Sequence, residues 1–480
     1  MILSHYDLSL CDELTFSVQT VSKETGIPAD KLCSTLDKLS ICFGALAGNK
    51  AEYFFLDNPV WTKPLIKIGD GRFFCAIPQV FFSFIFPIFD KLLSDSPQAK
   101  SAYQKRRADF LEKEIRAIFS KSFPHCEIFA GYKWKDGDNE YENDLLVKVD
   151  SHLILVEAKS GDISWQALRG ASDRMKRHVD ELLYAPSNQS YRLSNRIYES
   201  KANAQEQFNL LPNFPFNLDE IKTVLRLSVT LEDFAFIQTN LHLIKETGWI
   251  PEDHPLAPCM HLADLEVIFD MLESTPQKIH YLKRRSELEA NMNYMGDELD
   301  LLGFYLKTGF NIGVSEFNKD HFMLTGMSKK VDEYYTALDN GIQRKRPQQK
   351  MTNWWRDICM KLEVRGFHQW SDIANILLGF SFSEQLKAEA SFKRIKKHVL
   401  KFWQQDGHLC SIIITLSKYK FDAMALYAFR DRDKERRKER MENIAAQAFA
   451  ISHVKRCLIL GVNIDKDQYP YSIIAVYFND

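Results

Sequence analysis

The sequence predicts an α/β protein with more than one domain. The chain has 480 residues, a length that suits about two to four domains with sizeable cores. Hydrophobic residues make up 45% and charged residues 26%, as in globular proteins. Between residues 103 and 235, segments with helical spacing of apolar residues alternate with short strand-like runs. This alternation indicates helices packed on a sheet.

The first domain is expected at residues 1–100. Residues 14–40 contain two short amphipathic segments around Gly26 and Pro28, which resemble a helix-turn-helix. Residues 64–77 read as a hairpin that turns at a glycine-rich step. The second segment carries aspartates beside its lysines. A role in structure or protein contacts is therefore favoured over DNA reading.

The second domain is expected at residues 101–340. Its first part predicts a helix, three antiparallel strands, a helix and a further strand. The expected order is helix 103–123, strands 126–134, 141–150 and 152–159, helix 164–184, strand 223–231 and then helix 261–274.

The third domain is expected at residues 341–480, as an α/β domain of unknown role. Residues 341–350 are polar and basic and contain a proline, which predicts a linker. Strands are expected at 408–416, 456–464 and 471–478, and a charged helix at 431–450. The helix mixes acidic with basic residues, so a solvated face is favoured over a nucleic-acid arm.

Bulk composition limits the partners. The formal net charge is −2, so any nucleic-acid surface must be a local patch. Nine cysteines occur without a CxxC pair, which indicates a reducing, cytoplasmic location and no structural zinc. The apolar window 73–89 is interrupted by Pro78 and Pro87. No signal peptide and no membrane contact are expected.

Two carboxylates and a lysine stand at the tips of the predicted strands 141–150 and 152–159. They are Asp144, Glu157 and Lys159, and the last two share one strand face by their spacing. Charges beside such apolar runs are costly unless they are paired or bind a metal. A divalent cation held by Asp144, Glu157 and the carbonyl of Ala158 would neutralise both acids. Oxygen ligands of this kind suit Mg²⁺ or Mn²⁺.

Such a metal could polarise a phosphate and activate a bound water. Lys159 would orient that water, act on its proton or stabilise the transition state. The preceding helix offers Glu112 and Glu114 as a further acid, and periodicity alone does not choose between them. The alternative interpretation of the motif is a surface hairpin in which Glu157 and Lys159 form a salt bridge.

The arrangement resembles the PD-(D/E)xK, or restriction-endonuclease-like, nuclease superfamily, including the Mrr-like and other defence nucleases. The resemblance covers roughly residues 103–235 and departs from the family name at Asn143, which stands in place of proline. It implies a core of a helix, a three-strand meander, a helix and a strand. It also implies catalytic roles for Glu112, which follows Phe110 and Leu111 in an "FLE" match, and for Asp144, Glu157 and Lys159.

The function implied by the resemblance is an Mg²⁺-dependent (endo)deoxyribonuclease of prokaryotic anti-phage defence or restriction. Four polar side chains after Lys159 are candidate phosphate contacts. The alternative for each of them is an exposed side chain on a solvated helix face. They are Gln166, Arg169, Arg174 and Arg177.

Several alternatives stay open. The chain could instead be a non-catalytic sensor or scaffold that binds nucleic acid or protein through a nuclease-like fold. RNA as the substrate, endo- or exonuclease action, sequence specificity, the activating trigger, and a homo-oligomer or protein partner are also left undecided.

Overall fold

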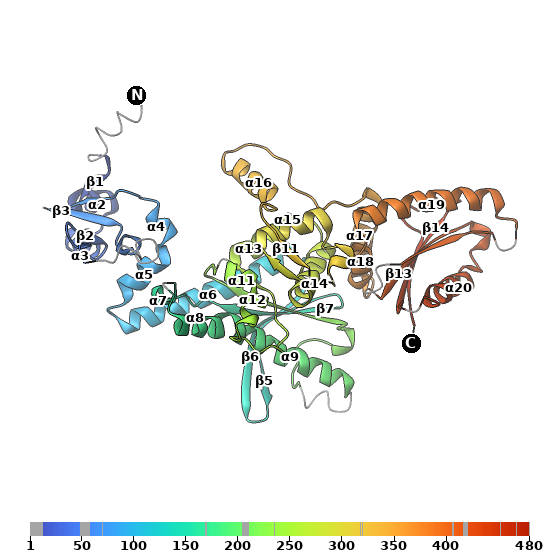
Figure 1. Cartoon of the computed structure of the whole chain (residues 1–480), viewed down its shortest axis with the longest axis horizontal. Coiled ribbons are helices and arrows are strands. Elements are labelled where there is room, and N and C mark those ends of the chain that lie inside the picture. Colours follow the sequence, from blue (N-terminus) through green and yellow to red (C-terminus); the bar gives the residue numbers. More distant parts are fainter. Residues whose placement is uncertain are drawn as a thin grey trace. The chain divides into compact units, whose positions relative to one another are not determined.

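A computed structural model shows a mixed α/β protein (Figure 1), as the coarse fold prediction required. It describes residues 13–48, 58–69, 71–168, 170–203, 211–234, 236–316, 318, 320–405, 408–415, 421–451, 453–466 and 468–479. The chain forms two compact units. One comprises Met1–Asp109 with Asp162–His178, and the other comprises Phe110–Gly161 with Val179–Asp480. The division into three domains at residues 100 and 340 stays a prediction.

The first unit contains a small four-stranded sheet of order β1-β4-β3-β2. The predicted pair of helices and the hairpin are present, and Gly26 ends the first helix in a left-handed conformation (φ 71°) that glycine adopts without strain. Val18, Leu32, Leu65 and Phe73 form its core. The elements are β1 (Thr15–Ser17), α2 (Val18–Thr25), α3 (Ala29–Lys38), β2 (Ser40–Cys42), η2 (Pro59–Trp61), β3 (Leu65–Gly69), β4 (Arg72–Phe74), α4 (Val80–Ser83) and α5 (Ile85–Leu93).

The apolar window 73–89 therefore supplies the end of β4 and most of two short helices. Among the described residues, no helix is both long and apolar enough to cross a bilayer. The long helix α6 (Pro97–Ser122) follows; it begins six residues before the predicted helix 103–123 and ends one residue earlier.

The second unit is built on a five-stranded sheet of order β5-β6-β7-β8-β9. The first three strands form an antiparallel meander, and β8 and β9 add to it in parallel. The four strands predicted in this region are confirmed, and β9 is an addition. The strands are β5 (Glu127–Asp136), β6 (Asn139–Val149), β7 (His152–Lys159), β8 (Thr223–Thr230) and β9 (Cys259–His261).

One face of this sheet is covered by a helix that the sequence did not predict, because the predicted helix ended at residue 184. Leu146, Leu153 and Leu155 of the sheet form a core cluster with Leu193 and Ile197 of α9 (Ala185–Ala202). Burying these side chains on a sheet face is worth roughly 1.5–3 kcal/mol each. The site strands β6 and β7 are thus fixed from one side by α9.

The prediction of one helix at 164–184 is wrong in its limits. The chain forms α7 (Trp165–Leu168), breaks at Gly170 with φ 93°, and resumes as α8 (Ser172–Val179). One π-helical turn, Asp180–Tyr184, then leads directly into α9. Pro186 lies in the first turn of α9, directly after the π-helical turn, and the chain stays helical through it.

A helical layer follows β8. It includes the predicted helix 261–274, shortened to α13 (Leu262–Met271). The remaining elements are η4 (Leu218–Glu220), α11 (Phe236–Thr239), α12 (Leu241–Glu246), α14 (Thr275–Asn291), β10 (Asn293–Met295), α15 (Glu298–Thr308), η5 (Gly313–Glu316), β11 (His321–Met323) and α16 (Lys329–Asp339).

The expected linker 341–350 has no helix or strand, but it is fastened to this layer. Arg346 donates to the carbonyl and carboxylate of Asp270, and buried Gln349 accepts from Gln277 at 3.0 Å.

The last part of the chain forms a four-stranded sheet of order β12-β13-β14-β15. The three predicted strands and the charged helix are present, whereas β13 was not predicted. Residues of β13 alternate between two hydrophobic clusters, because both faces of this strand are buried. The elements are α17 (Asn353–Arg365), α18 (Trp370–Leu378), α19 (Phe382–Phe402), β12 (Ser411–Thr415), β13 (Asp422–Phe429), η6 (Asp431–Asp433), α20 (Arg437–Phe449), β14 (Arg456–Asn463) and β15 (Ile473–Phe478).

Candidate active site

The predicted carboxylates meet where β6 and β7 stop pairing. The last paired residues at this end of the hairpin are Leu145 and Val156, and Asp144 and Glu157 follow immediately. The register places them on the face of Leu146 and Leu155, because side chains alternate along each strand. The sequence placed each acid at a strand tip, and the fold places the two acids side by side.

The backbone of β7 holds Asp144. Its Oδ2 accepts a hydrogen bond of 2.7 Å from the N–H of Ala158. In a strand, the N–H and C=O of one residue point to the same edge. The carbonyl of Ala158 therefore faces the β6 edge, on the side of Asp144. This is the position in which the sequence predicted a third oxygen ligand for the cation.

Glu157 is held by a relay of side chains. The residue is 0% exposed, and its Oε1 accepts from the side-chain amide of Asn143. The oxygen of that amide accepts from the indole N–H of Trp134 at 2.8 Å. Glu157 Oε2 is buried and has no hydrogen-bond partner in the described part of the chain. A buried carboxylate oxygen without a donor is costly, and it indicates a missing proton, water or cation.

The two carboxyl groups disturb each other's ionisation. Burial, followed by the neighbouring Asp144, raises the pKa of Glu157 well above its ordinary value. Burial also raises the pKa of Asp144, against the opposing hydrogen bond from Ala158 and the charge of Lys159. Burial and the neighbouring Asp144 therefore both oppose an uncompensated negative charge on Glu157.

Lys159 ends the same strand two residues beyond Glu157 and is half-buried. Its carbonyl accepts from the N–H of Leu231 at 3.1 Å, which fixes the end of β7 on β8. Among the described residues, no ion pair joins Glu157 to Lys159. The interpretation of this motif as an exposed salt-bridged hairpin is therefore wrong, because Glu157 is wholly buried.

The helix acids do not complete a three-carboxylate group. Glu112 is exposed on α6 and Glu114 is half-buried. Within the described residues, no group of three or more His, Cys, Asp or Glu side chains is arranged to hold a metal. The structure therefore brings together Asp144 and Glu157, but it does not gather Glu112 with them.

The candidate phosphate contacts belong to the first unit, whereas the carboxylates belong to the second. Gln166 on α7 and Arg174 and Arg177 on α8 are exposed. Arg169 lies outside the described residues. An exposed side chain is accessible to a ligand but shows none, so the role of these residues in phosphate contacts stays a prediction.

Sequence reasoning missed the residues that support the carboxylates. Asn143 was noted only as the departure from proline, yet it donates to Glu157. Ser228 pairs with Glu157 in the β7–β8 register, and its buried hydroxyl has no partner in the described part of the chain. Gln189 of α9 donates to the carbonyl of Glu142, next to Asn143. Buried polar residues in apolar strands were the available signal for Asn143 and Ser228.

These residues fit part of a divalent-cation shell. Asp144, Glu157 and the Ala158 carbonyl provide oxygen donors, and Oε2 of Glu157 lacks a partner in the described chain. Mg²⁺ and Mn²⁺ accept such oxygens and keep several waters when protein ligands are few.

Comparisons with known proteins give little further help. No family model matches the chain, and no curated protein matches it. Among solved structures, protein VC1899 from Vibrio cholerae matches with 12% sequence identity and a TM-score of 0.16. The match covers 52% of this chain and 52% of that chain, so the chain spans about half the length of that protein. So low a TM-score carries no argument about fold or function.

Proposed function

We propose that the chain is a metal-dependent phosphodiesterase that hydrolyses DNA, with Asp144, Glu157 and Lys159 at its centre. One observation carries the proposal: Glu157 is wholly buried beside Asp144, and one of its oxygens lacks a hydrogen-bond donor in the described chain. A divalent cation held by Asp144 and Glu157 would satisfy this oxygen and would offset the charge of both acids. It also supplies the charge that phosphodiester hydrolysis needs.

Each residue has a distinct task in this proposal. When bound, the metal polarises the phosphate and lowers the pKa of a coordinated water. Asn143 and Trp134 hold Glu157 in one orientation, and the Ala158 N–H holds Asp144. Lys159, at the end of the same strand, would orient the attacking water or stabilise the negative charge that develops on the phosphate.

The finer parts of the proposal come from the resemblance to PD-(D/E)xK nucleases. They are the restriction-endonuclease-like core, DNA as the substrate, and a place in prokaryotic defence or restriction. The order α6-β5-β6-β7, helices and β8 agrees with such a core. RNA hydrolysis and a homo-oligomer or protein partner stay open.

The test is cleavage of defined DNA and RNA substrates with Mg²⁺ and with Mn²⁺. Glu157→Gln and Asp144→Asn are expected to abolish cleavage and to weaken Mn²⁺ binding, because each removes a charged ligand. Glu142→Gln is the matched control, since Glu142 lies on the same strand but is exposed and pairs with Lys133 at 3.4 Å. Full activity of either site variant would overturn the assignment.

A second candidate is a non-catalytic sensor or scaffold that keeps a nuclease-like fold. The exposed position of Glu112 favours it, because the two-carboxylate site then lacks the acid that the resemblance requires. Mn²⁺ binding that Glu157→Gln removes, without cleavage of any nucleic acid, would support this candidate over the enzyme.

A further inference from the structure

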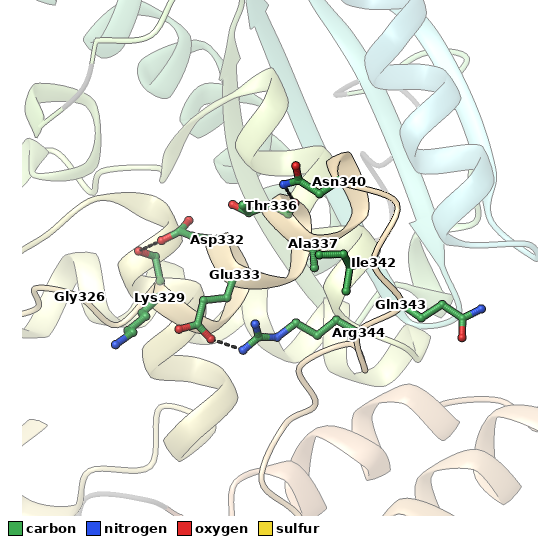
Figure 2. A pocket seen from close by; sticks show the side chains of 11 residues that line it. Gly326, Lys329, Asp332, Glu333, Thr336, Ala337, Asn340, Ile342, Gln343 and Arg344 are labelled. Carbon is green, nitrogen blue, oxygen red and sulfur yellow. Dashed lines mark hydrogen bonds and ion pairs between the residues drawn. The ribbon is translucent and has the colours of Figure 1, made fainter. Parts of the chain in front are cut away.

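Two cavities that neither Asp144 nor Glu157 lines differ in how their charges are paired. The larger, of about 680 Å³, lies along α16 (Figure 2). Both of its acids have partners: Glu333 pairs with Arg344, and Asp332 accepts from Ser328 at 2.8 Å. Such a surface has little need for a ligand.

The second cavity, of about 400 Å³, lies among α17, α19 and the segment that follows β14. Its volume is within the range of small-molecule sites. It lies beyond the carboxyl ends of the parallel strands β13 and β14. Ligands of α/β sheets bind at this edge.

One face of α19 lines this cavity with two lysines, Lys393 and Lys396, that pair with no carboxylate in the described part of the chain. Lys393 and Lys396 are three residues apart, so they project side by side. Neither lysine forms an ion pair with a described residue. Burial, and then the charge of Lys393, lowers the pKa of Lys396. Two adjacent ammonium groups without a counterion are suited to a phosphate.

Glu389, on the same helix face, needs a hydrogen-bond donor rather than an anion. Its Oε1 is buried and has no hydrogen-bond partner in the described chain, so it needs a donor from elsewhere. Two aromatic side chains also line the cavity. Trp354 stacks on Phe392 with ring centres 5.5 Å apart, and Tyr469 is 60% exposed. Aromatic walls of this kind accept a planar ring.

We propose that this cavity binds a mononucleotide, with its phosphate on Lys393 and Lys396 and its base beside Trp354 and Tyr469. The base donates to Glu389. Guanine fits best, because its adjacent ring N–H and amino group both donate, whereas a carboxylate only accepts. Adenine presents an acceptor beside its amino group and fits less well. The proposal is independent of the proposed nuclease activity.

The test is calorimetric titration of the full chain with guanosine 5′-monophosphate, adenosine 5′-monophosphate, guanosine and inorganic phosphate. The guanine nucleotide is expected to bind most tightly. The double variant Lys393→Ala/Lys396→Ala is expected to weaken its binding by roughly tenfold or more, since hydrogen bonds to charged groups are worth about that much. Glu389→Gln is expected to remove the preference for guanine over adenine.

Two controls keep the result specific. Lys397→Ala removes an exposed lysine of α19 that does not line the cavity, and it is expected to bind like the wild type. Glu157→Gln is also expected to retain binding, which separates this site from the carboxylate pair. No binding of the guanine nucleotide by the folded wild type would overturn the proposal. So would unchanged binding by the double variant, or phosphate alone binding as tightly as the nucleotide.

Discussion

Protonation of His152 is expected to destabilise β7, the strand that carries Glu157. His152 begins β7, is 0% exposed, and contacts two residues of α18. Its Nδ1 lies 2.9 Å from Ser371 Oγ, and its Nε2 lies 3.1 Å from the amide nitrogen of Asn375. Ser371 donates its own proton to Asp150, so the ring donates through Nδ1 and accepts at Nε2. A second ring proton would face the Asn375 amide, which is itself a donor.

The size of the effect follows from the burial of the ring. Burial lowers the pKa of His152 from 6.5 to about 4, while Asp372 and Asp150 oppose the change and Lys283 adds to it. The unfolded chain takes up this proton as the pH falls through 6.5. The native chain takes it up only when the pH falls to about 4. The two pKa values differ by about 2.5, and each unit is worth about 1.36 kcal/mol, so about 3 kcal/mol of unfolding free energy is lost on acidification. About 2 kcal/mol is lost by pH 5.

The assay compares urea unfolding of the wild type and of His152→Gln at pH 7.5 and pH 5. The wild type is expected to lose about 2 kcal/mol more than the variant over this interval, because glutamine does not titrate. The comparison concerns the dependence on pH, so a constant cost of the substitution does not affect it. The exposed His125 provides the control His125→Gln, which is expected to behave like the wild type. Equal losses in the wild type and in His152→Gln would refute the reasoning.

Three further predictions concern the carboxylate pair. Lys159→Ala is expected to lose roughly 10²–10⁴ in single-turnover cleavage while retaining DNA binding in Ca²⁺; loss of binding in proportion would make it a phosphate anchor instead. Glu112→Gln is expected to reduce cleavage more than Glu114→Gln, since only the first matches the family pattern, and equal rates for both variants would remove α6 from the mechanism. Asn143→Ala is expected to lower the free energy of unfolding by about 1–3 kcal/mol, because it leaves buried Glu157 without a donor; calorimetric or urea unfolding would measure this, and an unchanged value would contradict the relay.

The sequence predicted the part of the site that depends on local spacing. Asp144 and Glu157 flank an apolar hairpin, and period-2 alternation was enough to place Glu157 and Lys159 on one face. It was also enough to find the strands of the meander, because their apolar runs are long and bounded by turns. The break at Gly170 was missed, since a glycine inside a helical pattern does not by itself show that its φ is positive.

The amino-acid sequence by itself determined the α/β class, the strands that carry the acids and the identity of the acids. Only the tertiary structure decided that Asn143 and Trp134 hold Glu157 and that Ser228 stands beside it. The physical reason is that periodicity gives the face on which a side chain lies. The groups that meet it there come from segments distant in the chain, and their positions depend on packing, which no local pattern encodes.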